Sequence, residues 1–120
     1  MNEKSDEGWL EGITRKRPET ALVLHQLLIT VRRKGSCTAE DAHNIPVTHP
    51  NVRGAAMKLL GKCGCCKRDV PIRGTTKESH GHWLHVWEVR VPQVFMGVHE
   101  RLKQSVTTIA RMESAQMEML

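Results

Sequence analysis

The sequence predicts an α+β fold in which three helices precede a β-hairpin and one further helix follows it. Apolar residues recur at intervals of three and four between residues 18 and 62, which is the spacing of helix faces. Residues 83–91 alternate in polarity and are rich in β-forming side chains. A chain of 120 residues is the size of one domain with an appended element. We therefore expect an N-terminal tail (1–17), a domain (18–92) and a C-terminal helix (93–120).

The tail is polar at its start and carries four acidic side chains against one lysine within residues 1–12. This pattern is not that of a secretory signal, and no apolar run of about 18 residues appears that would span a membrane, so we expect a cytoplasmic protein. Trp9, Leu10 and Ile13 can dock on the domain, and the basic cluster 15–17 can contact a phosphate. The composition favours a solvated linker over either role.

The first two helices of the domain have recognisable ends. Proline suits the first turn of a helix and glycine the residue after its last turn, so the first helix is expected to begin at Pro18 and end at Gly35. Thr38 and Asp41 have the spacing of a capping box at the start of the second helix. That helix is short, because the residue before Pro46 avoids helical geometry.

The third helix is expected over residues 51–62. Thr48 or His49 would cap it, and Pro50 would occupy its first position, where a missing N–H is tolerated. Gly64 would terminate it.

Residues on either side of the polar loop 74–82 are expected to pair as a β-hairpin. The pairing sets Ile72 opposite Leu84 and Val70 opposite Val86. One face of the hairpin must cover the helices, and the pattern is compatible with either face.

From residue 93 onward, apolar side chains recur at alternating intervals of three and four, as in a heptad seam. The helix can pack on its own domain or on a second copy of the chain. We expect a homodimer, because the segment is too long to be covered by so small a core. The expected dimer contacts are Phe95, Val98, Leu102, Ile109 and Met112.

Positive charge is concentrated in the third helix and the hairpin. Residues 50–91 hold eight basic side chains against three acidic ones, a net charge of +5, whereas residues 1–12 have a net charge of −3. A basic stretch of this kind suits a phosphate backbone.

At the start of a helix that enters the major groove, exposed Asn and Arg side chains reach base edges. The sequence therefore predicts base contacts from His49, Asn51 and Arg53. Hydroxyl and ammonium groups nearby, and cations of the hairpin, are expected to touch phosphates. These expected phosphate contacts are Thr48, Lys58, Lys62, Arg73 and Lys77.

A cysteine-rich corner after the third helix raises the possibility of zinc, since Cys63 and Cys66 have the spacing of paired ligands. The hairpin would set the later histidines at the far end of its strands, about 15 Å away. We therefore expect buried structural cysteines, no metal and no cofactor. No nucleophile or phosphate-loop motif appears, so no enzyme is expected. The residues concerned are Cys63, Cys65, Cys66, His80, His82 and His85.

The span 18–91 resembles the winged-helix superfamily. The resemblance rests on the amphipathic helix 21–31, on 38–41, on the segment 47–60 and on the closing strand 83–89. It implies a winged helix-turn-helix with three helices and a β-hairpin wing, an added C-terminal helix serving as a dimer arm, and duplex DNA binding as a small prokaryotic or phage transcriptional regulator. The alternatives are a protein-interaction module on the same scaffold, such as a phage accessory or inhibitor protein, and a zinc-stabilised structural protein. The cysteine-rich corner and the long wing depart from the usual pattern.

Overall fold

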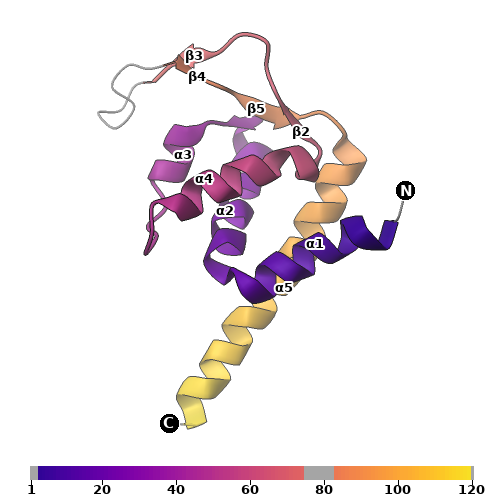
Figure 1. Ribbon diagram of the computed structural model, residues 1–120, viewed down its shortest axis with the longest axis vertical. Coiled ribbons are helices and arrows are strands. Elements are labelled where there is room, and N and C mark those ends of the chain that lie inside the picture. The colour runs from indigo at the N-terminus through magenta and orange to yellow at the C-terminus, as the bar shows by residue number, and fades with distance from the viewer. Residues whose placement is uncertain (1–2, 75–82, 120) are drawn as a thin grey trace.

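The computed structural model describes the backbone of residues 3–74 and 83–119 and the side chains of residues 8–74, 83–108, 110 and 111. Within these ranges the chain folds as an α+β domain in which helix α2 contacts α1, α4, α5 and strand β1 (Figure 1). The helices are α1 (Glu3–Lys16), α2 (Pro18–Lys34), α3 (Ala39–His43), α4 (Asn51–Lys58), the 3-10 turn η1 (Leu59–Cys63) and α5 (Pro92–Met119).

The predicted ends of α2 and the start of α3 are confirmed. Pro18 occupies the first turn of α2, and Gly35 follows the helix with φ 89°, in the left-handed region. Thr38 and Asp41 form the capping box of α3, in which a carboxylate oxygen of Asp41 accepts from the Thr38 N–H at 2.8 Å.

The third predicted helix is shorter than expected and is not capped as expected. It is α-helical only to Lys58 and tightens into η1, which Gly64 terminates with φ 79°. A Cβ at Gly64 would lie 2.8 Å from the Val91 carbonyl oxygen and 3.0 Å from the Phe95 nitrogen, so the close approach of the start of α5 requires glycine as well. Pro50 occupies the N-cap position, and no side chain caps the helix there.

The strands of the described residues form two small sheets. Strands β1 (Ser36–Cys37), β5 (Trp87–Val89) and β2 (Cys65–Lys67) form an antiparallel sheet in the order β1-β5-β2, and β3 (Ile72–Arg73) pairs with β4 (Trp83–Leu84). Strand β1 was not predicted, because two residues are too few to show a period.

The expected hairpin register is half right. Ile72 lies opposite Leu84, as predicted. Val70 does not lie opposite Val86, because the four residues 68–71 bulge against the two residues 85 and 86. Val70 is consequently 73% exposed while Val86 is buried.

The expectation of a solvated linker in residues 1–17 is wrong. Glu3–Lys16 is a helix, Leu10 is fully buried, and Trp9 and Ile13 pack against the core. Thr14 is buried beside them and satisfies its hydroxyl by donating to the Leu10 carbonyl at 2.8 Å. Because the apolar face of α1 is narrow, most of its residues are polar, and its composition does not reveal a helix packed on the core.

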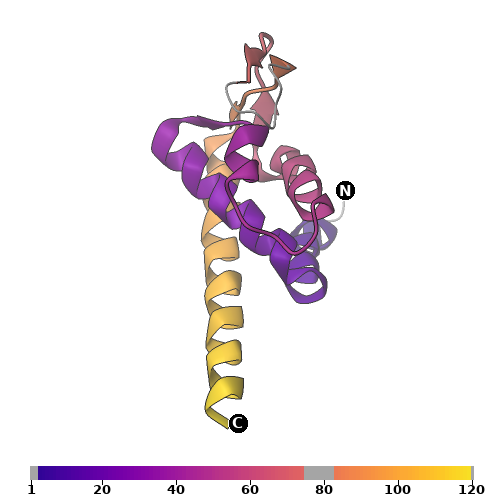
Figure 2. The ribbon, with the colours of Figure 1, turned by 90° about the vertical axis from the view of Figure 1, so that its left-hand side faces the viewer.

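Helix α5 has a packed part and a projecting part. Phe95, Val98 and Leu102 are buried in the core of their own chain, so their assignment to a dimer interface is wrong. The C-terminal part of α5 projects beyond the domain (Figures 1 and 2). Ile109 and Met112 lie on this helix, but their side chains are outside the described residues. Across residues 3–74 and 83–119, no helix is both long and apolar enough to cross a bilayer.

Candidate nucleic-acid interface

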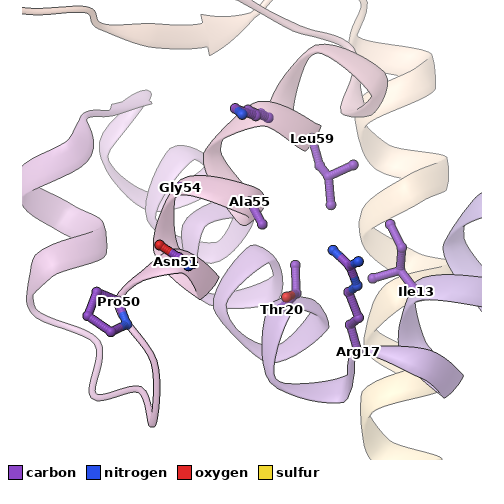
Figure 3. A pocket seen from close by; sticks show the side chains of 9 residues that line it. Ile13, Arg17, Thr20, Pro50, Asn51, Gly54, Ala55 and Leu59 are labelled. Carbon is purple, nitrogen blue, oxygen red and sulfur yellow. The ribbon is translucent and has the colours of Figure 1, made fainter.

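Helix α4 presents a row of small and polar side chains at the surface of the domain. Asn51, Gly54 and Lys58 are exposed and follow one another at intervals of three and four residues, so they share one face. This face borders an open groove of about 610 Å³ between α4 and the junction of α1 with α2 (Figure 3). The described residues that line the groove are Ile13, Arg17, Thr20, Pro50, Asn51, Gly54, Ala55, Lys58 and Leu59.

Arg17 forms the wall of the groove that faces α4. It is the single residue between α1 and α2, and its side chain extends from that junction toward Leu59 (Figure 3). The groove therefore has a guanidinium on one wall and the Lys58 ammonium on the other. Arg17 was not among the predicted site residues, although the basic cluster 15–17 was the signal that pointed to it.

Thr48 is engaged by a carboxylate of its own chain. Glu19 accepts a hydrogen bond from the Thr48 N–H at 3.0 Å, and its two oxygens lie 2.8 and 3.0 Å from the Thr48 hydroxyl, which donates to them. These contacts fasten the turn before α4 to the first turn of α2. The anionic partner that we expected from a DNA phosphate is thus supplied by Glu19.

Arg53 is folded back onto the turn between α3 and α4. Its Nε and one terminal nitrogen donate to the Ile45 carbonyl oxygen at 3.1 and 2.8 Å. The guanidinium therefore satisfies a carbonyl of the turn rather than projecting from α4, contrary to the expected base contact. Asn51 and His49 remain exposed at the start of the helix.

Three basic side chains outside the groove rest on tryptophan rings within the described part of the chain, and one of them is Lys67, whose Nζ lies 5.4 Å from the ring centroid of Trp87. Lys62 Nζ lies 5.4 Å from the ring centroid of Trp9, which directs this predicted phosphate contact toward α1. On the hairpin, Arg73 lies over Trp83 at 4.9 Å, and these two residues are also directly opposite each other in the β3–β4 ladder. Lys77, the other hairpin residue predicted to contact DNA, lies outside the described residues.

Three of the four cysteines, Cys37, Cys63 and Cys65, are buried, and Cys66 is partly buried. Burial raises the pKa of Cys37 and of Cys63 to about 12, and that of Cys65 to about 11. Thiols of such high pKa are poor nucleophiles and hold a proton that zinc would have to displace. Over the described residues, no three or more His, Cys, Asp or Glu side chains are grouped so as to hold a metal ion. His85 is exposed, and His80 and His82 lie outside the described residues.

Comparison of the chain with protein-family models, with curated proteins and with solved structures finds no match. The geometry of the described residues therefore carries the functional proposal.

Proposed function

We propose that the chain is a winged-helix protein that binds duplex DNA through α4 and the β3–β4 hairpin. The observation that carries the proposal is the order of elements, in which α2, β1, α3 and α4 are followed by the paired strands β3 and β4. Strand β1 pairs with β5 and forms one edge of the other sheet. A short helix, a turn and a surface helix followed by a β-hairpin would place α4 in the major groove and the hairpin beside it.

The groove beside α4 supplies the contacts. Asn51 is an exposed amide at the start of the helix, where a side chain of this type can pair with an adenine edge. Arg17 and Lys58, on the two walls, would bind phosphates on either side of that contact. His49 is exposed two positions before Asn51, and Arg73 and Lys77 would meet the backbone from the hairpin.

The same proposal includes a homodimer formed by the projecting part of α5. The helix continues to Met119, beyond the part that holds Phe95 and Leu102 in the core, and its seam carries Ile109 and Met112. A dimer presents two copies of α4 to a two-fold site, which suits a small transcriptional regulator of a prokaryote or phage. Removal of residues 109–120 should give a folded monomer by sedimentation, and an unchanged dimer would refute the arm.

Fluorescence anisotropy with a random-sequence duplex tests DNA binding. We expect micromolar affinity at about 50 mM salt and a loss of at least about tenfold at about 200 mM, because phosphate contacts release counterions. Lys58→Gln should weaken binding, whereas Lys103→Gln, the same change of charge on α5, should not. Absence of binding at low salt, or equal effects of the two substitutions, would contradict the proposal.

A second candidate function is the binding of a protein partner by the hairpin. Ile72 and Trp83 are 47% and 61% exposed there, on opposite faces of the ladder because Ile72 pairs with Leu84 and Trp83 with Arg73, and Val70 is exposed on the bulge. Apolar side chains left exposed on a short ribbon favour association with another protein. Such binding would not weaken with salt, so a partner complex that survives at high salt would favour this function over the first.

A further inference from the structure

A second concave site lies where α2 packs against α5. Its volume is about 330 Å³, within the range of small-molecule sites. Five of the six described residues that line it are basic or protonatable and the sixth is isoleucine, so this lining carries no carboxylate. They are His25, Ile29, Arg32 and Arg33 from α2, and His99 and Lys103 from α5.

This pocket faces away from the α4 groove. Thr20 lines the groove and Ile29 lines the pocket. Ile29 follows Thr20 by nine residues, which is about two and a half helical turns, so the two side chains leave α2 in opposite directions. The pocket and the groove share no lining residue.

The two histidines meet across the contact between α2 and α5, with their ring centroids 5.7 Å apart. Burial lowers the pKa of His25, and the charges of His99 and Lys103 lower it further. Burial likewise lowers the pKa of His99; Arg32 and Lys103 act in the same direction, and the Glu100 carboxylate beside it opposes them. Both rings are therefore neutral at neutral pH, and a proton added to either meets positive charge.

We propose that this pocket binds a small dianionic oxyanion, of the class of a phosphate group on a small molecule. The guanidinium groups of Arg32 and Arg33 match the paired oxygens of such an anion, and Lys103 and the two imidazoles add further donors. A dianion in the pocket would replace repulsion among these groups with attraction. The inference goes beyond DNA binding and uses no residue of the α4 groove.

Binding should tighten as the pH falls. The free protein has lowered pKa values at His25 and His99, and a bound dianion would raise them. Each ring that takes up a proton on binding then contributes up to about tenfold in affinity per pH unit, between its pKa in the complex and its pKa in the free protein. Sulfate is the suitable probe, because it stays a dianion throughout this range whereas a phosphate group takes up a proton itself.

The test is a titration of the full chain with sodium sulfate, and with sodium chloride at equal ionic strength, followed through the ring-proton NMR signals of the two histidines. We expect saturable shifts of both signals in sulfate but not in chloride. The affinity for sulfate should be at least about tenfold higher at about pH 5.5 than at about pH 7.5. Arg32→Gln should weaken sulfate binding at least about tenfold, and the fold should survive because this arginine is exposed. His43→Gln, which changes an exposed histidine of α3, should leave sulfate binding unchanged.

Three results would overturn the proposal. Equal shifts in sulfate and chloride would mean that the histidines respond to ionic strength alone. Equal affinity at both pH values would mean that they take no part in binding. A duplex that shifts both signals in the absence of sulfate would assign the pocket to a nucleic-acid backbone rather than to a small molecule.

Discussion

The contact between Glu19 and Thr48 should oppose DNA binding while it supports the fold. The carboxylate holds the N–H and the hydroxyl of Thr48 at 2.8–3.0 Å, just before α4 begins. If a DNA phosphate approached the same Thr48 groups, it would lie about 5 Å from the carboxylate. At that distance the repulsion is about 0.8 kcal/mol with the dielectric constant of water and about 3 kcal/mol with a value near 20. Glu19→Gln should therefore tighten duplex binding by about fourfold to about 100-fold.

Glu19→Gln should also weaken the fold while it strengthens DNA binding. A glutamine still accepts from Thr48 but loses the charge-assisted bond, which should lower the free energy of unfolding by about 1 kcal/mol. Anisotropy at about 50 mM salt measures the affinity, and a urea melt measures the stability. Glu100→Gln is the matched control, because it makes the same change of charge on a different helix, α5. If the two variants bind DNA equally well, Thr48 does not lie on the path of a phosphate.

Three further results are expected. Leu102→Ala should destabilise the chain by about 2–5 kcal/mol in urea melts, because the leucine is fully buried in its own domain. Met96→Ala, on the exposed side of α5, should change stability by less than about 0.5 kcal/mol. Neither melt should depend on protein concentration, and a melt that does would contradict the intramolecular core. Arg53→Ala should lower stability by about 1–3 kcal/mol, since it leaves a carbonyl of the α3–α4 turn without its partner, and an unchanged melt would refute this role. The contribution of His25 and His99 to stability should be fully present above about pH 6.5 and should fall as the pH drops toward their lowered pKa values. The reason is that the unfolded chain binds protons more readily at these two positions. A flat pH profile that His99→Gln does not alter would count against the buried pair.

Local signals in the sequence were sufficient for most of the helices. Pro18 and Gly35 bound α2, and the capping box of Thr38 and Asp41 starts α3, because each of these effects depends on residues a few positions apart. The register of Ile72 could be anticipated for the same reason, since a hairpin pairs neighbouring segments. A bulge is not visible in such a pattern, and that is why the partner of Val70 was predicted wrongly.

Contacts between distant segments could not be anticipated. Glu19 and Thr48 are separated by 29 positions, and β1 pairs with β5, which lies about fifty residues further along the chain. Arg53 illustrates the same limit: its spacing fits a base contact, but only the fold reveals that the Ile45 carbonyl lies within its reach. A candidate site chosen from side-chain chemistry alone therefore includes groups that the chain uses on itself.

Periodicity identified the apolar face of α5 but not what covers it. Phe95, Val98 and Leu102 follow the spacing of a coiled-coil seam, and the same spacing suits a helix lying on its own domain. The deciding fact is that α1 and α2 supply the opposing surface, and the contribution of α1 was hidden by its polar composition.

Helix α2 links the two proposed sites, yet they should act independently. Thr20 faces the α4 groove, and Ile29 faces the oxyanion pocket on the other side of the helix. Coupling between sites requires an element with two arrangements that both ligands bias. Helix α2 is poorly suited to that role, because seven of its residues are buried and it packs against six other elements. Saturating sulfate at constant ionic strength should therefore leave the affinity for a duplex unchanged within about twofold, and a larger change would mean that α2 shifts when the pocket is filled.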